Sequence, residues 1–392
     1  MPVTSLVATL LPNRGIADRA VRCWDAGEAI APIPIATPRT EISERLAHLR
    51  PTHLVDEHGR HVLADGIPVD ADTAAVVTTS GTTANPKLVE LTRSGMEVMG
   101  RGYSHAVGAN DQDRWLACMP LHHVASLAIV ARAYVCDLPF VVHEGLDVDR
   151  VARSYVDDGA TMISLVPTVL HRLLEAGAPL DRFRCLIIGG AVLPDGLRAR
   201  SEAIGARVVD AYGLTETWGG CAINGSANHG VELRLGTDGE VEVRGAPVMR
   251  AYRFAPDETK AVLGDDGWFR TGDVGTLAAG RLRVIDRIKD LIITGGVNVS
   301  PTAVEDVLID HPAIDDVTVV GLPDDEWGER VAAVVVAHPD AELPTLAALR
   351  DFARDRLSPP QLPRELRTVD SIPRTAGGKA LRRLVRDAIV SE

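Results

Sequence analysis

The chain has 392 residues, 46% of them hydrophobic, and its 54 acidic and 41 basic residues give a formal net charge of −13. This length supports a substantial core and favours two domains over one. The acidic balance, without a basic stripe, argues against a nucleic-acid binder. No apolar stretch reaches the length of a membrane span and no signal peptide is visible, so we expect a cytoplasmic protein.

The five cysteines are scattered through the sequence without the C-x-x-C spacing of zinc and redox sites. Their odd number in a long chain argues against a disulfide scaffold. We therefore expect buried thiols that pack as small hydrophobic side chains.

Short β-branched runs alternate with amphipathic segments between residues 74 and 209. We expect strands at residues 74–79, 115–119, 140–143, 162–166, 185–188 and 207–209. Helices are expected between them at residues 94–106, 124–135, 148–157, 168–175 and 195–204. Strand–helix–strand units repeated at this spacing predict an α/β fold, with mainly parallel sheets flanked by helices.

After residue 217 the sequence alternates apolar and polar residues. Segments 232–235 and 240–244 are separated by Asp238-Gly239, a dipeptide typical of hairpin turns. This pattern predicts a small antiparallel β unit attached to the main sheet.

A domain boundary is expected near Lys289, which divides the chain into an N-terminal domain of residues 1–288 and a C-terminal domain of residues 289–392. The second part is expected to contain strands at 291–294, 317–320, 331–337 and 367–369, and helices at 303–309 and 346–357. About 100 residues with their own strands and helices predict a small α+β domain.

The loop at residues 78–87 gathers hydroxyl groups, one glycine and one lysine between two apolar runs. Hydrogen bonds can be donated by the hydroxyls of Thr79, Ser80, Thr82 and Thr83. Lys87 adds a positive charge, so the loop suits a polyphosphate, although it is not a Walker P-loop. On composition alone, a polar surface turn is an equal alternative.

Four further motifs follow this loop in order along the chain. They are Tyr212-Gly-Leu-Thr-Glu-Thr217, Gly267-Trp-Phe-Arg-Thr-Gly-Asp273, Asp286-Arg-Ile-Lys-Asp-Leu-Ile292 leading into Gly295-Gly-Val-Asn298, and Pro373-Arg-Thr-Ala-Gly-Gly-Lys379. Together the five motifs resemble the core motifs of the adenylate-forming superfamily, which comprises acyl-CoA synthetases, peptide-synthetase adenylation domains and luciferases. The resemblance covers about residues 73–385.

The resemblance implies an enzyme that joins a carboxylic acid to ATP with Mg²⁺, releases pyrophosphate, and passes the acyl group to coenzyme A. A short N-terminal region and the segment Thr217-Trp-Gly-Gly-Cys221 resemble o-succinylbenzoate–CoA ligases of menaquinone synthesis. A small or aromatic acid is therefore the expected substrate. Two alternatives stay open, namely transfer to a carrier protein or an amine, and a non-catalytic nucleotide-binding homologue. A carrier protein and a homodimer stay open as partners.

The resemblance also implies roles for individual residues. The β- and γ-phosphates would be held by Thr79, Ser80, Gly81, Thr82, Thr83 and Lys87. The adenine would be contacted by Tyr212, Gly213 and the turn Gly189-Gly190-Ala191. Thr215 would bind the α-phosphate, Glu216 would be a magnesium ligand, Asp273 would contact the ribose, and Arg287 would add a second contact to the ribose or to a phosphate.

Further roles fall at the acyl pocket and in the C-terminal domain. His123 would divide the nucleotide from the acyl pocket, and Lys379 would be the catalytic lysine carried by a mobile domain. Lys289 would be the hinge, and the thiol would enter near Gly295-Gly296.

Each of these residue types also has a plainer explanation. Thr215 can cap a helix, Asp273 can stabilise a turn, and Lys379 can be one cation in a basic tail. The chain also departs from glycines usual in the family, because Ala84, Leu88 and Asp286 occupy those positions. How these three residues affect activity is left open at this stage.

Overall fold

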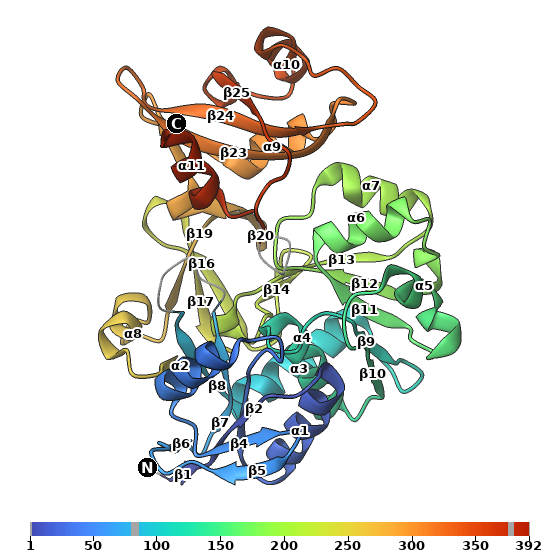
Figure 1. Cartoon of the computed structure of the whole chain (residues 1–392), viewed down its shortest axis with the longest axis vertical. Helices are drawn as coiled ribbons and strands as arrows, with labels where there is room; N and C mark the ends of the chain where they lie inside the picture. Colours follow the sequence, from blue (N-terminus) through green and yellow to red (C-terminus); the bar gives the residue numbers. More distant parts are fainter. Residues whose placement is uncertain (1, 80–85, 375–379, 392) are drawn as a thin grey trace.

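The structure is a computed structural model that describes residues 2–79, 86–374 and 380–391. Its largest sheet follows the order β10-β9-β11-β12-β13-β14-β15-β20-β19-β17-β16 (Figure 1). One half of it is parallel, formed by β9 (Trp115–Ala117), β10 (Phe140–Val142), β11 (Met162–Leu165), β12 (Cys185–Ile188) and β13 (Val208–Tyr212).

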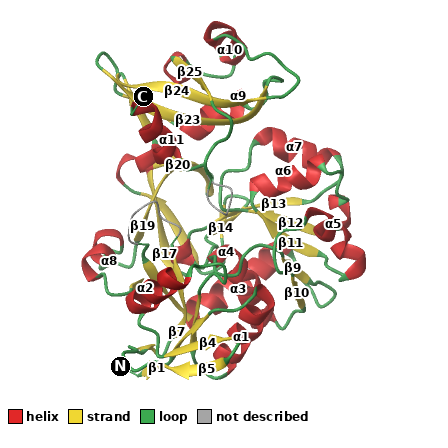
Figure 2. Ribbon diagram, viewed as in Figure 1, coloured by secondary structure: helices red, strands yellow, loops and turns green. Residues whose placement is uncertain are grey.

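Helices cover both faces of this parallel half (Figure 2). Strand β12 shows why, because Leu186 and Ile188 face one hydrophobic cluster while Cys185 and Ile187 face another. Alternate residues of a strand point to opposite faces, so a strand apolar throughout is buried on both sides. The covering helices are α3 (Arg93–Val107), α4 (Val124–Cys136), α5 (Val148–Asp157), α6 (Pro167–Glu175) and α7 (Asp195–Ala203).

The other half of the sheet is antiparallel and confirms the predicted β unit. Strands β16 (Val231–Leu235) and β17 (Glu240–Gly245) pair as a hairpin, and the turn residues Asp238 and Gly239 have φ angles of 59° and 77°. Positive φ at both positions is why this dipeptide favours the turn. The remaining strands are β14 (Ala222–Ile223), β15 (Ser226–Ala227), β19 (Phe269–Ala278) and β20 (Arg281–Arg287).

No sequence pattern predicted strands before residue 74, yet the residues there form much of a second sheet of order β18-β8-β7-β3-β2-β4-β5. Its strands are β2 (Leu6–Thr9), β3 (Ala29–Pro32), β4 (His53–Asp56), β5 (Gly59–Val62), β7 (Thr73–Thr78), β8 (Leu88–Thr92) and β18 (Ala251–Tyr252). The helices of this region are α1 (Asn13–Asp25) and α2 (Arg39–Leu49), and β1 (Val3–Thr4) pairs with β6 (Val69–Asp70).

The residues after position 291 form a further sheet at the C-terminal end of the molecule (Figure 1). Its strands are β21 (Ile292–Thr294), β22 (Val297–Val299), β23 (Ile314–Asp324), β24 (Gly328–Ala337) and β25 (Glu365–Thr368). Helices α9 (Pro301–Leu308), α10 (Leu346–Ala353) and α11 (Arg382–Val390) complete it. The division into two domains at residue 289 stays a prediction.

The structure corrects several predicted bounds. Strand β13 continues to Tyr212 instead of ending at residue 209, because its last residues pair with β14. Strand β23 spans eleven residues instead of four, since polar residues on its exposed positions interrupt the apolar run without ending the pairing. Helix α10 ends at Ala353, where Arg356 and Leu357 donate N–H groups to the same Ala353 carbonyl.

All five cysteines are free, as predicted, and four are buried while Cys136 is partly exposed. Among the described residues, no helix has the length and apolar character needed to cross a membrane.

Asp306 of α9 makes stability depend on pH. Burial, followed by the charges of Glu305, Asp195, Asp310 and Asp286, raises its pKa to about 7. The folded carboxyl keeps its proton to near pH 7, whereas an unfolded aspartate loses it near about pH 4. Stability is therefore expected to fall as the pH rises from about 4 to about 7.

Asp306→Asn tests this expectation by removing the titrating group. At pH 8 we expect the melting temperature of the variant to exceed that of the parent protein by about 2–4 °C. Scanning fluorimetry across a pH series should also show a flatter profile for the variant. Asp315→Asn, at an exposed position on β23, is the control. A parallel pH profile for Asp306→Asn and the parent would contradict the assignment.

Candidate nucleotide-binding site

The carboxyl ends of β12 and β13 lie side by side. Ile188 and Asp210 are paired in parallel register, so the turn at Gly189 lies next to Ala211. A Cβ atom on Gly189 would lie 3.0 Å from the Ala211 carbonyl oxygen, and Gly190 has a φ of +80°. Glycine therefore permits this close approach at the sheet edge where ligands bind in open α/β sheets.

Three predicted ribose and adenine residues meet beside this edge. The Tyr212 hydroxyl donates a hydrogen bond of 2.8 Å to Asp273 Oδ2, and Arg287 Nε lies 3.0 Å from Asp273 Oδ1. The backbone pairing of β19 with β20 places Asp273 opposite Arg287. Asp273 is only 5% exposed, so this carboxylate is buried, whereas Tyr212 is partly buried and the Arg287 side chain is 39% exposed.

Burial, and then the charge of Asp273, raises the pKa of Tyr212 well above its ordinary value. The phenol therefore stays protonated at neutral pH and acts as a donor to the carboxylate. A buried carboxylate held between a phenol and a guanidinium has a fixed orientation. A carboxylate with a fixed orientation accepts hydrogen bonds from hydroxyl donors better than a freely moving surface aspartate does.

The predicted metal ligand, Glu216, lies on the single turn η2 (Thr215–Thr217). Its Oε1 accepts a 2.7 Å hydrogen bond from the Tyr252 hydroxyl, and Lys87 Nζ lies 4.3 Å from the centre of the Tyr252 ring. Lys87 also forms a 3.0 Å ion pair with Glu258 of α8 (Pro256–Val262). The structure thus brings the predicted Glu216 and Lys87 together around one tyrosine.

Tyr252 and Glu258 were missed by sequence reasoning. Burial, and then the charge of Glu216, raises the pKa of Tyr252 above its ordinary value, so its hydroxyl remains a donor. Tyr252 and Glu216 are 36 positions apart in the sequence. No local pattern links them, because their contact depends on β18 pairing with β8.

The predicted phosphate loop is described only at its two ends. Thr79 donates its N–H to the Lys87 carbonyl at 2.9 Å, and the Lys87 N–H donates to Thr79 Oγ1 at 3.2 Å. The predicted residues Ser80, Gly81, Thr82 and Thr83, and also Ala84, lie outside the described residues. Leu88, one departure from the family's glycines, is the first residue of β8 and is buried in the core.

His123, predicted to divide the nucleotide from the acyl pocket, lies at the N-terminus of α4. A Cβ atom on Gly219 would lie 3.8 Å from Ala125 Cα, so residues 213–221 approach the first turn of α4. The His122 and His123 rings are 4.2 Å apart, and among the described residues His123 Nε2 is buried without a hydrogen-bond partner. Burial lowers the pKa of His123, and that of His122 to about 4, so both imidazoles are neutral at physiological pH.

Two further predicted glycines occupy tight positions. A Cβ atom on Gly213 would lie 2.2 Å from the backbone of Gly219, and only glycine avoids this steric clash. Gly295 and Gly296 form the turn between β21 and β22, where a Cβ atom on Gly295 would lie 2.8 Å from the Trp327 ring. The structure therefore places Gly295 against the Trp327 ring. Lys379 lies outside the described residues.

Comparisons with known proteins show the family to which this chain is similar. A model of the AMP-binding enzyme family matches residues 60–236, and a model of the AMP-binding enzyme C-terminal domain matches residues 303–379. The chain is 34% identical over 343 residues to a 2-succinylbenzoate–CoA ligase of Bacillus licheniformis, covering 79% of this chain and 69% of that protein. A probable 2-succinylbenzoate–CoA ligase of Mycobacterium tuberculosis is 35% identical, with 80% and 84% of the two chains covered.

Solved structures of o-succinylbenzoate CoA synthetase are also similar to this chain. The o-succinylbenzoate CoA synthetase of Bacillus subtilis, in complex with its acyl-adenylate intermediate, superposes with a TM-score of 0.85 at 30% identity. That alignment covers 98% of this chain and 88% of the synthetase. The same synthetase with ATP and a magnesium ion gives a TM-score of 0.84 at 28% identity.

The fold and these similarities define the class of adenylate-forming enzymes, which confirms the predicted superfamily and fold. Within that class, the chain belongs to the AMP-binding enzyme family. Its similarity to 2-succinylbenzoate–CoA ligases confirms the resemblance seen in its motifs.

Proposed function

We propose that this enzyme is an ATP-dependent acid–CoA ligase whose acid is 2-succinylbenzoate. It would first join the acid to the α-phosphate of ATP and release pyrophosphate. The thiol of coenzyme A would then attack the acyl carbon, form the thioester and release AMP. The similarity to 2-succinylbenzoate–CoA ligases along about four-fifths of the chain supports this acid.

One observation carries the nucleotide part of the proposal, namely the buried Asp273 carboxylate held by Tyr212 and Arg287. A carboxylate can accept hydrogen bonds from two neighbouring hydroxyls, which suits the vicinal diol of a ribose. Arg287 lies beside it as a cation for the ribose or a phosphate. The position of this group at the strand edge beside Gly189 fits a nucleotide bound there.

Glu216 fits the magnesium ion that such a reaction requires. Within the described part of the chain, no group of three or more His, Cys, Asp or Glu residues is arranged to hold a metal. Magnesium keeps waters and phosphate oxygens and takes one or two carboxylates, so a single oriented glutamate suits it. When bound, the ion would neutralise phosphate charge, while Tyr252 fixes the Glu216 carboxylate and Lys87 supplies a further cation.

Tyr252→Phe is expected to weaken the use of magnesium without disturbing the ring contact with Lys87. The variant loses only the hydroxyl that orients Glu216, and loss of such an outer-shell partner typically costs about tenfold in metal affinity. We expect the half-saturating Mg²⁺ concentration for ATP binding, followed by calorimetry, to rise by that factor. Tyr155→Phe, on the exposed face of α5, is the control. An unchanged magnesium requirement would remove Tyr252 from this role.

Pyrophosphate release from ATP and Mg²⁺ across a panel of carboxylic acids, with and without coenzyme A, tests the proposed reaction. We expect release with 2-succinylbenzoate, strongly increased by coenzyme A, and formation of the thioester. Release with another aromatic acid, and not with 2-succinylbenzoate, would support the proposed reaction and contradict the proposed substrate. Release that responds to a carrier protein or an amine, and not to coenzyme A, would overturn the acceptor.

Three expectations accompany this proposal. The proposed reaction uses small soluble substrates, so we keep the cytoplasm as the compartment. A carrier protein, as the alternative acceptor to coenzyme A, and a homodimer, as the assembly, also stay predictions. Analytical ultracentrifugation of the purified chain measures its oligomeric state directly.

A further inference from the structure

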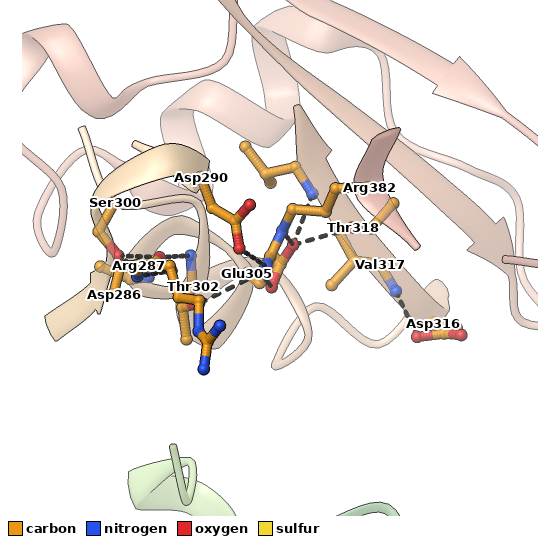
Figure 3. A network of polar contacts seen from close by, with 12 residues as sticks. Asp286, Arg287, Asp290, Ser300, Thr302, Glu305, Asp316, Val317, Thr318 and Arg382 are labelled. Carbon is orange, nitrogen blue, oxygen red and sulfur yellow. Dashed lines mark hydrogen bonds and ion pairs between the residues drawn. The ribbon is translucent and has the colours of Figure 1, made fainter. Parts of the chain in front are cut away.

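A buried carboxylate joins the end of β20 to the start of α9. Asp286 is 7% exposed, and its Oδ2 accepts the Ser300 hydroxyl at 2.8 Å and the Thr302 N–H at 3.1 Å (Figure 3). Its Oδ1 accepts the Arg287 N–H at 2.8 Å. These contacts connect residues on opposite sides of the hinge predicted at Lys289, so a rotation there must break or remake them.

The same contacts fix the first turn of α9. Ser300 Oγ accepts the Ala303 N–H at 3.1 Å and so caps the helix, while its own hydroxyl proton goes to Asp286. An ionised carboxylate at a helix N-terminus is stabilised by the N–H groups there. Asp286 thus holds the helix through its cap and through the N–H of Thr302.

From α9 the network continues to the residues that flank segment 375–379. Arg382, at the start of α11, contacts Glu305 at 2.6 Å and the Thr302 hydroxyl at 3.2 Å. On the other flank, Arg374 pairs with Asp316 at 2.6 Å. The described residues on both sides of the predicted catalytic Lys379 are therefore held by side chains of the C-terminal sheet and of α9.

At its other end, the network contacts the group formed by Tyr212, Asp273 and Arg287. Arg287 follows Asp286 directly and pairs with Asp273, which holds Tyr212. A continuous path of hydrogen bonds and ion pairs therefore runs from Tyr212 and Asp273 through Arg287 and Asp286 to Arg382 at the start of α11.

A pocket lies beside the polar contacts of this junction. A cavity of about 270 Å³ lies between β19, β20 and α9, with Arg283, Ile285, Ala303 and Asp306 among its lining residues. A cavity leaves its lining atoms without packing partners, so it adds little to the attachment of α9. The attachment thus depends on directional hydrogen bonds, which form in one orientation and are lost in others.

We propose that Asp286 is a positioning residue for the adenylation step. Its carboxylate holds α9, and through Arg382 the residues that follow Lys379, in a fixed position relative to Tyr212, Asp273 and Arg287. This inference rests on the proposed function and on rotation at Lys289. Asp286 touches neither substrate nor reacting atoms. Its contacts favour the orientation in which they form, and their loss disfavours adenylation while leaving thioester formation intact.

Asp286→Asn is the first test, since the amide keeps the shape but cannot accept hydrogen bonds with both of its ends. We expect the rate of pyrophosphate release to fall about tenfold, equivalent to one lost hydrogen bond to a charged group. The dissociation constant of ATP and the rate of thioester formation from preformed acyl-adenylate should stay within about twofold, well below a tenfold effect. Hydrogen exchange should accelerate in residues 300–308 and 380–390.

Two further variants separate positioning from loss of folding. Ser300→Ala removes the same contact from the other side, so its effect should not add to that of Asp286→Asn in the double variant. Asp113→Asn is the matched control, because Asp113 is a buried carboxylate that binds Thr161 and Arg184 far from the junction. We expect Asp113→Asn to change the rates of adenylation and of thioester formation by the same factor.

Equal losses in both half-reactions of Asp286→Asn, or an unchanged adenylation rate, would overturn the inference. So would full additivity of the Asp286 and Ser300 substitutions. If the parent protein releases no pyrophosphate with any acid, the proposed function fails separately. The hydrogen-exchange comparison then decides the inference alone, since unchanged exchange in α9 and α11 overturns it.

Discussion

Asp273→Ala is expected to raise the KM for ATP by about 100-fold, because hydrogen bonds to a charged group contribute about 1.5–3 kcal/mol each. The carboxylate is buried and both of its oxygens are engaged, by Tyr212 and by Arg287. Its removal takes away the proposed ribose acceptor and also leaves the Tyr212 hydroxyl without its partner. Steady-state kinetics of pyrophosphate release at saturating acid measure the change.

Asp273→Asn separates the loss of charge from the loss of the acceptor. The amide can still accept one hydrogen bond, so we expect a smaller rise in KM than for alanine. Calorimetric titration with ATP tests binding directly, and thermal unfolding monitors the fold. Wild-type ATP affinity in a folded Asp273→Ala protein would exclude Asp273 from the nucleotide site.

Lys379→Ala is expected to reduce adenylation by about 10²–10³-fold, the usual cost of removing one group that stabilises charge in a transition state. In the proposed reaction, two anions must approach each other, and an ammonium placed between the carboxylate and the α-phosphate offsets their repulsion. Thioester formation from preformed acyl-adenylate should proceed at the rate of the parent protein. Single-turnover measurements of the two half-reactions distinguish these effects.

Lys379→Arg is the matched variant, since it keeps the charge on a larger, planar head group. We expect partial recovery of adenylation relative to alanine. Arg383→Ala, which removes a nearby exposed cation on α11, controls for the general loss of positive charge. Adenylation at a near-parental rate in Lys379→Ala would show that another residue performs this step.

Local sequence patterns predicted the elements of the parallel sheet well. The bounds expected for β12 and α5 agree with the structure residue by residue. Apolar runs and amphipathic periodicity are properties of neighbouring residues, so a sequence carries them directly. The N-terminal strands β2 and β4 were not assigned, because single short apolar runs there lack the alternation that marked later segments.

For the site, the sequence motifs predicted the residues that lie within them and missed the residues outside them. The motifs identified Tyr212, Asp273 and Arg287, and the structure brings these three side chains into contact. The motifs gave no indication of Tyr252, which orients Glu216. They also marked Asp286 only as a departure from a usual glycine, whereas the structure shows it bound to Ser300 and Thr302.

The sequence alone determined the family, the order of strands and helices in the parallel half of the main sheet, the hairpin at Asp238-Gly239 and the residues of the nucleotide motifs. These features depend on residue type and on spacing along the chain. Only the tertiary structure decided which side chains orient the motif residues, as Tyr252 does for Glu216 from 36 positions away. The reason is physical, because a contact between distant residues depends on how strands pair and helices pack, which no local pattern specifies.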